Sequence, residues 1–337
     1  MKFKLSHPVA MTALASTAIL WGSASIAANE CKPMTVQVNH EMGVGTPTAE
    51  ALEWYGSQIE NDTDGDVKFR YFHTYQLGSE RETYDMLQSG SVQMGVSGAQ
   101  IISALAPEYG TLLLPYLFTS ADHFGRVLDG PIGEEMHEQF LKNKGIRILG
   151  WAHRAPRHIT STKKEIHTPE DMKGFKIRIR QIPVQIEAFR AIGASPVPMP
   201  FPEVYTALQT GVIDGQENPA SIMDANSFSE VQNYLILSSH IREAFWWEIS
   251  DRVWQKMCSE YQEIFEKYIP EAIKKSNEQE AAEDESYITA LGEKGMEIIE
   301  LTDEEAASFA DKMPAVVEKF SDEWKEGLYD DIIDLAD

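Results

Sequence analysis

Three basic residues alternate with apolar ones near the middle of this 337-residue chain. In the run Phe175–Arg180 (FKIRIR), Lys176, Arg178 and Arg180 share one side of an extended strand, and the apolar residues share the other. A guanidinium presents a planar fork of donors that can hold both oxygens of a carboxylate. On spacing alone, a solvated strand face is the simpler interpretation. An anion site therefore has to be argued from the elements around this run.

The segment 174–219 predicts alternating strands and helices. Units of this kind build parallel sheets, whose ligands lie beyond the carboxyl ends of the strands. Asn218 directly follows the last expected strand, so it is placed where a ligand would lie. The expected strands are Phe175–Ile179, Pro196–Pro200 and Ile213–Gln216, and the expected helices are Pro183–Ile192 and the stretch from Pro202 to Gly211.

A second copy of part of this pattern occurs earlier in the chain. The segment Glu82–Gln93 (ETYDMLQSGSVQ) matches Glu203–Asp214 (EVYTALQTGVID) without a gap, and at the same offset Ser97 corresponds to Asn218. Chance similarity of two amphipathic helices that end in glycine is the weaker explanation, because so many positions agree. We infer two lobes of related local architecture, with polar residues meeting across a cleft.

The rest of the chain predicts the elements that complete such lobes. The chain is expected to cross into the second lobe at 152–156, and Ser238–His240 is a plausible place for it to return. A long charged helical pattern runs from Ser250 to Tyr287 and is interrupted near Pro270. Further strands are expected over 34–39, 67–72, 93–96 and 145–151, and further helices over 48–60 and from the capping box of Ser79 and Glu82 to Leu87.

Composition limits the possible partners. The formal net charge is −24, and it becomes −26 when Lys2 and Lys4 are removed with an N-terminal segment. Such a chain repels nucleic acid and anionic lipid, so we expect neither as a partner. Residues 259–337 hold 24 acidic and 7 basic residues, which indicates helices with solvated acidic faces.

The N-terminus has the pattern of an export signal. Two lysines precede an apolar run from Val9 to Trp21, and Ser25–Ala27 fits a signal-peptidase site. The apolar run is too short and too rich in Ser and Thr to span a membrane comfortably. We therefore expect residues 1–27 to be a cleaved signal peptide, and the mature protein to be periplasmic and not inserted in the membrane.

Two cysteines, Cys31 and Cys258, leave two possibilities open. An oxidising periplasm would permit a bridge between them, and a buried thiol at Cys258 is the equal alternative. The chain has no CxxC motif, and its nine histidines show no metal-ligand spacing. We expect no metal and no cofactor.

The central block resembles a known family. The run KIRIRQIP…AIGASPVPMPFPEVYTALQTGVIDGQENP, together with QLGSERE (76–82) and PRHITSTK…TPEDMKG (156–174), is similar to the solute-binding proteins of tripartite ATP-independent periplasmic (TRAP) transporters, of the C4-dicarboxylate-binding type. The resemblance covers nearly all of the mature chain. It implies a two-lobe α/β fold with parallel-rich sheets, an interlobe ligand cleft and a long helix across both lobes. We expect lobe I to comprise 28–154 and 244–283, and lobe II to comprise 155–243 and 284–337.

The resemblance also implies site residues. It assigns the carboxylate-clamping arginine to Arg178, a second arginine to Arg157 and a ligand-contacting asparagine to Asn218. Arg180 departs from the family, which more often has a smaller or uncharged residue there, and Arg154 has no family match. Further predicted ligand contacts are His40, Ser97, Trp151, Phe201 and Trp247; for Trp247 a place in the core stays open, and we expect Trp246 to be a core residue.

These observations predict a binding protein and not an enzyme. We expect a monomeric periplasmic subunit that captures a small organic anion (a monocarboxylate, sugar acid or dicarboxylate) by lobe closure and delivers it to TRAP membrane subunits. The ligand-binding subunit of a sensor system is one alternative. A hydrolase is another, although the chain has no GxSxG, HExxH or phosphate-loop motif.

Overall fold

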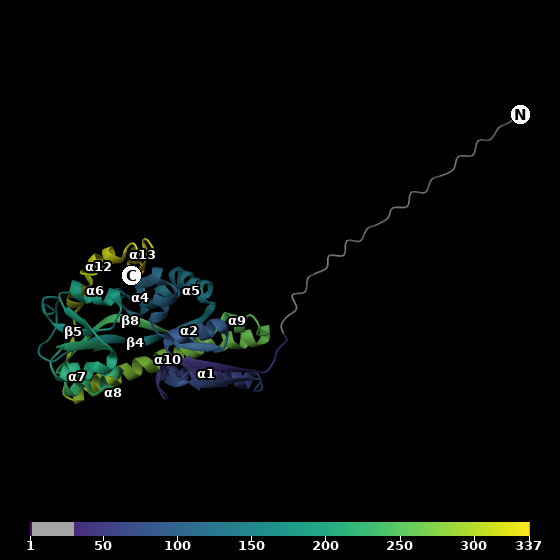
Figure 1. Ribbon diagram of the computed structural model, residues 1–337, viewed down its shortest axis with the longest axis horizontal. Coiled ribbons are helices and arrows are strands. Elements are labelled where there is room, and N and C mark those ends of the chain that lie inside the picture. The colour runs from purple at the N-terminus through teal and green to yellow at the C-terminus, as the bar shows by residue number, and fades with distance from the viewer. Residues whose placement is uncertain (2–29, 337) are drawn as a thin grey trace.

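The computed structural model describes Met1 and residues 30–336. The predicted signal peptide therefore lies, except for its first residue, outside the described residues. Within them, no helix has both the length and the apolar composition that a membrane crossing requires. The described chain forms a layer of strands covered by helices, and the chain runs from the purple β1 and α1 to the yellow α12 and α13 (Figure 1).

The described strands form a single sheet in the order β2-β1-β3-β8-β4-β7-β5-β6, with β9 paired to β8. The pairs β1–β2, β1–β3, β5–β6, β5–β7 and β8–β9 are parallel, whereas β3–β8, β4–β7 and β4–β8 are antiparallel. The predicted parallel-rich α/β character is thus confirmed. The strands are β1 (Met34–His40), β2 (Val67–Phe72), β3 (Met94–Ser97), β4 (Ile146–Ser161), β5 (Lys176–Ile179), β6 (Ser195–Pro198), β7 (Gly215–Asn218), β8 (Tyr234–Ser250) and β9 (Glu297–Glu300).

Two long strands, β4 and β8, connect the two ends of the sheet. They pair along their length, but their register shifts between Arg154 and Arg157 and again between Arg157 and Ile159. Pro156 lies at the first shift and has no backbone N–H to donate, and Ser239 in the partner strand has a positive φ of 42°. The predicted crossings near 152–156 and Ser238–His240 therefore fall inside continuous strands, at the level where pairing is irregular.

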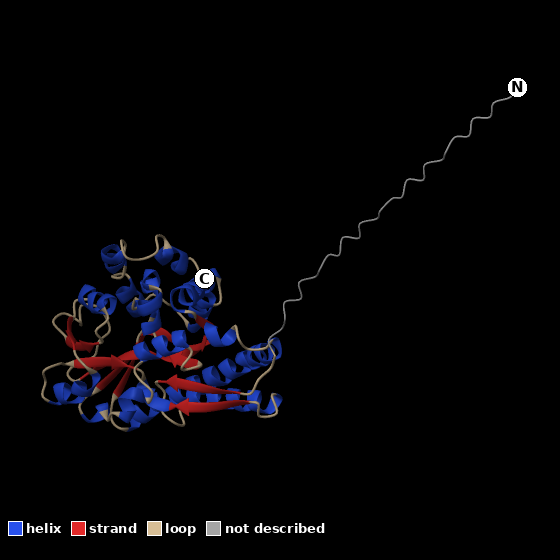
Figure 2. Ribbon diagram, turned by 45° about the vertical axis from the view of Figure 1, so that its right-hand side comes forward, coloured by secondary structure: helices blue, strands red, loops and turns tan. Residues whose placement is uncertain are grey.

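The helices lie outside the strand layer (Figure 2). α6 contacts α12, and α10 contacts α1, β4 and α8. The α-helices are α1 (Pro47–Asp62), α2 (Glu80–Ser89), α3 (Gln100–Leu105), α4 (Ala121–Leu128), α5 (Pro131–Lys144), α6 (Pro183–Ala191), α7 (Val204–Gln209), α8 (Ala220–Ala225), α9 (Asp251–Trp254), α10 (Ser259–Glu293), α11 (Asp303–Ala310), α12 (Pro314–Phe320) and α13 (Leu328–Ile333). Short 3₁₀ turns occupy His73–Tyr75, Pro107–Leu113, Phe201–Glu203 and Phe228–Glu230.

The prediction of an interruption at Pro270 was wrong. The 35-residue helix α10 continues through this proline, and the chain before it forms the end of β8 and the short α9 instead of one helix from Ser250. Proline removes one helical hydrogen bond, but Ile269 and Ala272 on either side of Pro270 are buried. Packing of this face outweighs the lost bond. The helix runs beneath both ends of the sheet, as expected for the family (Figure 1).

The two copies of the internal repeat have the same local structure. Gly90 and Gly211 both take left-handed φ values, 79° and 71°, as helix α2 or α7 ends. Two residues later, the N–H of Val92 bonds the carbonyl of Met86, just as the N–H of Ile213 bonds that of Ala207. The strands that follow, β3 and β7, each pair in parallel with a preceding strand and antiparallel with a long one. Ser97 and Asn218 are the last residues of these two strands.

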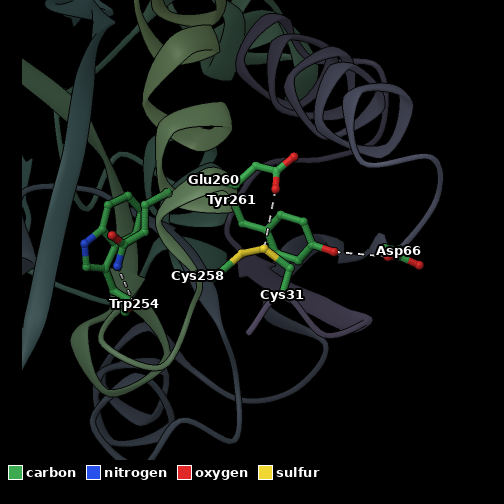
Figure 3. The surroundings of a disulfide bond; sticks show 7 residues. Cys31, Asp66, Trp254, Cys258, Glu260 and Tyr261 are labelled. Atoms are coloured by element: carbon green, nitrogen blue, oxygen red, sulfur yellow. Dashed lines mark hydrogen bonds between the residues drawn. A yellow bond between two sulfur atoms is a disulfide. The ribbon is translucent and has the colours of Figure 1, made fainter. Parts of the chain in front are cut away.

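A disulfide joins Cys31 to Cys258, which resolves the alternative that the sequence left open. The two Cα atoms are 5.0 Å apart, and Cys258 is the residue that precedes α10. Figure 3 shows Trp254, Tyr261 and Glu260 around the bond, with the Tyr261 hydroxyl donating to Asp66 at 3.2 Å. The bridge therefore ties the first described residues to the start of the long helix.

Candidate functional site

Arg178 lies in β5 with only 5 % of its surface exposed. Its Nε and Nη2 atoms donate to the carbonyl oxygen of Met199 at 3.1 and 3.0 Å, and its guanidinium lies 5.7 Å from the ring centre of Phe201. Nη1 makes no hydrogen bond to the described residues. The guanidinium is thus held in place from one side by a backbone carbonyl and an aromatic ring, and one donor edge stays available.

Arg157 is also buried, but its charge is already matched. Its Nε and Nη2 donate to the two carboxylate oxygens of Glu217, and Nη2 also donates to the Oδ1 atom of Asn218 at 2.9 Å. The Nε2 atom of His240 lies 3.5 Å from Glu217. Burial alone would raise the pKa of Glu217, but Arg157, His240 and Arg180 together hold it below its ordinary value. Arg157 therefore positions Asn218 from within an ion pair.

Two further arginines beside these have carboxylate partners. Arg180, directly after β5, donates from Nη2 to Glu243 of β8 at 2.5 Å. Arg154 of β4 donates from Nη1 to Glu41, just after β1, at 2.8 Å. Burial would raise the pKa of Glu243, but the charges of Arg180, Arg157 and Arg154 lower it to about 2. The carboxylate of Glu243 is therefore ionised at neutral pH.

We call Arg154, Arg157, Arg178 and Arg180 the arginine cluster. Of these four, Arg178 is the one without a carboxylate partner among the described residues. Burial lowers the pKa of Arg178 to about 10, the charge of Glu217 opposes this, and the charges of Arg157 and Arg180 add to the lowering. An anion bound at Arg178 would offset this repulsion and stabilise the charged form of the guanidinium.

A cavity of about 270 Å³ lies beside the cluster, where both ends of the sheet meet α10. We call it the interlobe cavity. Arg154 is the cluster member that lines it, and none of the eight predicted ligand residues does. Its acidic lining residues are Glu41, Glu280, Glu283 and Asp284, and burial raises the pKa of Glu280 to about 7 and that of Asp284 to about 6. This cavity suits an anion poorly, so we place the candidate anion site at Arg178.

His40 and Ser97 lie at the ends of β1 and β3. His40 is fully buried, neither ring nitrogen has a hydrogen-bond partner, and burial together with the neighbouring His73 lowers its pKa to about 4. Ser97 donates to the buried carboxyl group of Glu248. Burial raises the pKa of Glu248 to about 8, although the bond from Ser97 opposes the shift. Both predicted contacts are thus buried, uncharged side chains at the ends of their strands.

The two predicted tryptophans lie elsewhere. Trp151 lines a separate groove of about 710 Å³ with α4 and α10, and its indole N–H donates to Asp129 at 2.8 Å. Trp247 is fully buried, and its ring centre lies 5.7 Å from that of Tyr55 in the core beneath α1. The expected core residue Trp246 packs edge-on against Phe140. The structure therefore brings neither Trp151 nor Trp247 to Arg178.

Sequence reasoning missed the three acidic partners of the cluster, Glu41, Glu217 and Glu243. The one signal for Glu217 was its place next to Asn218 at the end of a short expected strand, where a charge has to be paired if it is buried. Glu243 and Glu41 come from segments far from the arginines in sequence, so only the fold reveals them. Within the described part of the chain, no group of three or more His, Cys, Asp or Glu side chains is arranged to hold a metal.

Residues 38–323 match the model of the bacterial extracellular solute-binding protein, family 7. The chain belongs to this family, the TRAP periplasmic solute-binding proteins. A solute-binding protein from Verminephrobacter eiseniae is 32% identical to this TRAP protein over 80% of each chain. One from Roseobacter denitrificans is 31% identical over 93% of this chain and 94% of its own.

Solved structures agree with this membership. A TRAP periplasmic solute-binding protein from Ochrobactrum anthropi, with its C-terminus bound in the ligand-binding pocket, has a TM-score of 0.87 and 30% identity, covering 91% of this chain and 96% of its own. The Roseobacter denitrificans protein with bound L-galactonate has a TM-score of 0.75 and 28% identity, covering 91% and 100%. This TRAP solute-binding protein therefore has the two-lobe α/β fold that its sequence predicted.

Proposed function

We propose that this TRAP solute-binding protein captures a small organic acid at Arg178 and delivers it to the membrane subunits of its transporter. One observation carries the proposal: within the arginine cluster, Arg178 has a free donor edge and no carboxylate of its own. A ligand carboxylate that accepts from this edge supplies the missing charge. Each such charge-assisted bond contributes about 1.5–3 kcal/mol when it is shielded from water.

The ligands of similar proteins support the chemical class. The relative from Escherichia coli, 28% identical over 87% of this chain, is a 2,3-diketo-L-gulonate-binding periplasmic protein. Similar structures hold L-gulonate in a Haemophilus influenzae protein and succinate in a Sulfurospirillum deleyianum protein. All three ligands are small organic acids with at least one carboxylate, which is the group that a guanidinium fork binds.

The neighbouring residues have supporting roles in this proposal. Phe201 covers one face of Arg178 and keeps water from it, and Arg157 holds the amide of Asn218 near the ligand. His40 and Ser97 would contribute from the ends of β1 and β3. Exclusion of water matters because the attraction between a carboxylate and a guanidinium strengthens as the local dielectric constant falls.

Lobe closure would bring these residues together. We propose lobes comprising 28–154 with 244–283 and 155–243 with 284–337. The boundary positions Arg154 and Glu243 face each other in the β4–β8 register, next to the irregular pairing at Pro156. Two strands with broken pairing are a suitable hinge for rigid-body closure. We further propose a monomer that is exported to the periplasm, loses residues 1–27 by cleavage and releases its ligand unchanged.

Calorimetric titration of the variant Arg178→Ala with organic acids tests this function. We expect at least about tenfold weaker binding, the loss of one charge-assisted bond. The control is Arg190→Ala, which removes an exposed arginine of the neighbouring helix α6 and its pair with Glu187. Unchanged affinity in the Arg178 variant, or equal losses in both variants, would exclude the carboxylate site. Mass spectrometry of the recovered ligand checks that no turnover occurs.

A further inference from the structure

We propose that the Arg180–Glu243 pair selects ligands with a hydroxyl group beyond the carboxylate, so that the preferred solute is a hydroxylated monocarboxylate and not a dicarboxylate. This inference rests on the proposed function and specifies its ligand. Arg180 follows Arg178 by two residues, and its partner Glu243 comes from a strand more than sixty residues away in sequence.

The pair leaves one donor and one acceptor unused. Arg180 bonds Glu243 through Nη2 and Oε1, whereas the Nε atom of Arg180 and the Oε2 atom of Glu243 are buried and have no hydrogen-bond partner. The unused donor is on the guanidinium and the unused acceptor is on the carboxylate of one bonded pair. A hydroxyl group can accept one hydrogen bond and donate another, so a single ligand hydroxyl satisfies both.

The position of the pair matches a ligand held by Arg178. Arg180 follows Arg178 by two residues, so both side chains project to the same side of the chain, about 6.6 Å apart along an extended backbone. A carboxylate at Arg178 therefore directs the following carbons of the ligand toward Arg180 and Glu243.

A second carboxylate on the ligand would find no unpaired arginine among the other three members of the arginine cluster. Glu243 already neutralises Arg180, Glu217 neutralises Arg157, and Glu41 neutralises Arg154. The unpaired oxygen of Glu243 would instead repel it, since this carboxylate is ionised. Arg242 adjoins Glu243 on β8, so its side chain projects to the opposite face of that strand, where the charge of Asp284 of α10 acts on it.

Three acids with a four-carbon skeleton test the inference by calorimetry: D-erythronate, butyrate and succinate, with L-galactonate as a longer hydroxy acid. For the wild-type chain we expect D-erythronate to bind at least about tenfold more tightly than butyrate or succinate, because a site with buried hydroxyl partners rejects analogues that lack the hydroxyl. In Glu243→Gln, the ratio of D-erythronate to butyrate affinity should fall toward one. Succinate should bind more tightly than in wild type, since Arg180 has lost its carboxylate.

The matched control is Asp251→Asn. It removes the carboxylate of a different arginine–carboxylate pair, between β4 and α9, in which Arg147 donates to Asp251 at 2.7 Å, and should leave the affinity ratios unchanged. The wild-type ratios are decisive even if Glu243→Gln folds poorly. Binding of butyrate or succinate as tight as that of D-erythronate overturns this inference alone. No binding of any of the four acids overturns the proposed function together with it.

Discussion

Arg157 of β4 and Glu217 of β7 form a buried bidentate ion pair between two adjacent antiparallel strands. Glu217 is opposite Ile159 in the register, so Arg157 reaches it diagonally, two residues away, and the same guanidinium also holds the side chain of Asn218. This relationship links stability to the binding site, because the same carboxylate compensates a buried charge and orients a predicted ligand contact.

Glu217→Gln should destabilise the protein strongly. The substitution leaves the charge of Arg157 buried without compensation, which typically costs about 3–5 kcal/mol. Urea unfolding followed by circular dichroism measures the change. The double variant Arg157→Met with Glu217→Leu is the control, because it removes both charges and should be more stable than the single variant. A single variant as stable as wild type would show that the pair contributes little.

Removal of the disulfide should lower stability and spare binding. The bridge closes a loop across 227 residues, and the loss of such a constraint on the unfolded chain typically costs about 2–4 kcal/mol. The candidate site at Arg178 lies in β5, five strands away from β1 in the sheet, which is about 24 Å at the usual strand spacing. We therefore expect Cys31→Ser/Cys258→Ser to unfold at lower temperature, with ligand affinity within a factor of two of wild type. A large loss of affinity would indicate that the bridge also governs the site.

Glu248 should make stability depend on pH. Burial raises its pKa from 4.5 to about 8, so between these values the folded chain binds more protons than the unfolded chain at this group. Its contribution to the free energy of unfolding then falls as pH rises through the window, by up to about 1.4 kcal/mol per pH unit. Urea unfolding at pH 5.5, 7.0 and 8.5 should show wild type losing stability relative to Glu248→Gln. Exposed Glu293→Gln is the control and should run parallel to wild type.

Trp247→Leu distinguishes a core residue from a ligand contact. The side chain is fully buried against Tyr55, so the smaller residue should lower the free energy of unfolding by about 2 kcal/mol or more. Ligand affinity should stay within a factor of two, measured by calorimetry below the unfolding transition. A tenfold weaker affinity at unchanged stability would return Trp247 to the ligand site.

Local signals in the sequence are enough to predict most helices and strands of this protein and its family. Apolar periodicity, the capping box of Ser79 and Glu82, and the two glycines Gly90 and Gly211 are local signals, and the structure bears them out within a few residues. The repeat also predicted correctly that Ser97 and Asn218 occupy equivalent strand ends. These features need no information from distant parts of the chain, which explains why they can be predicted.

Tertiary structure alone decided which charges are paired. Sequence showed Arg154, Arg157, Arg178 and Arg180 as similar basic residues, but folding brings Glu41, Glu217 and Glu243 to three of them and leaves Arg178 free. It also decided that Pro270 stays inside a helix and that Cys31 meets Cys258. The physical reason is the same in each case: burial and packing join groups that are distant in sequence, and at those contacts they outweigh the local preferences of single residues.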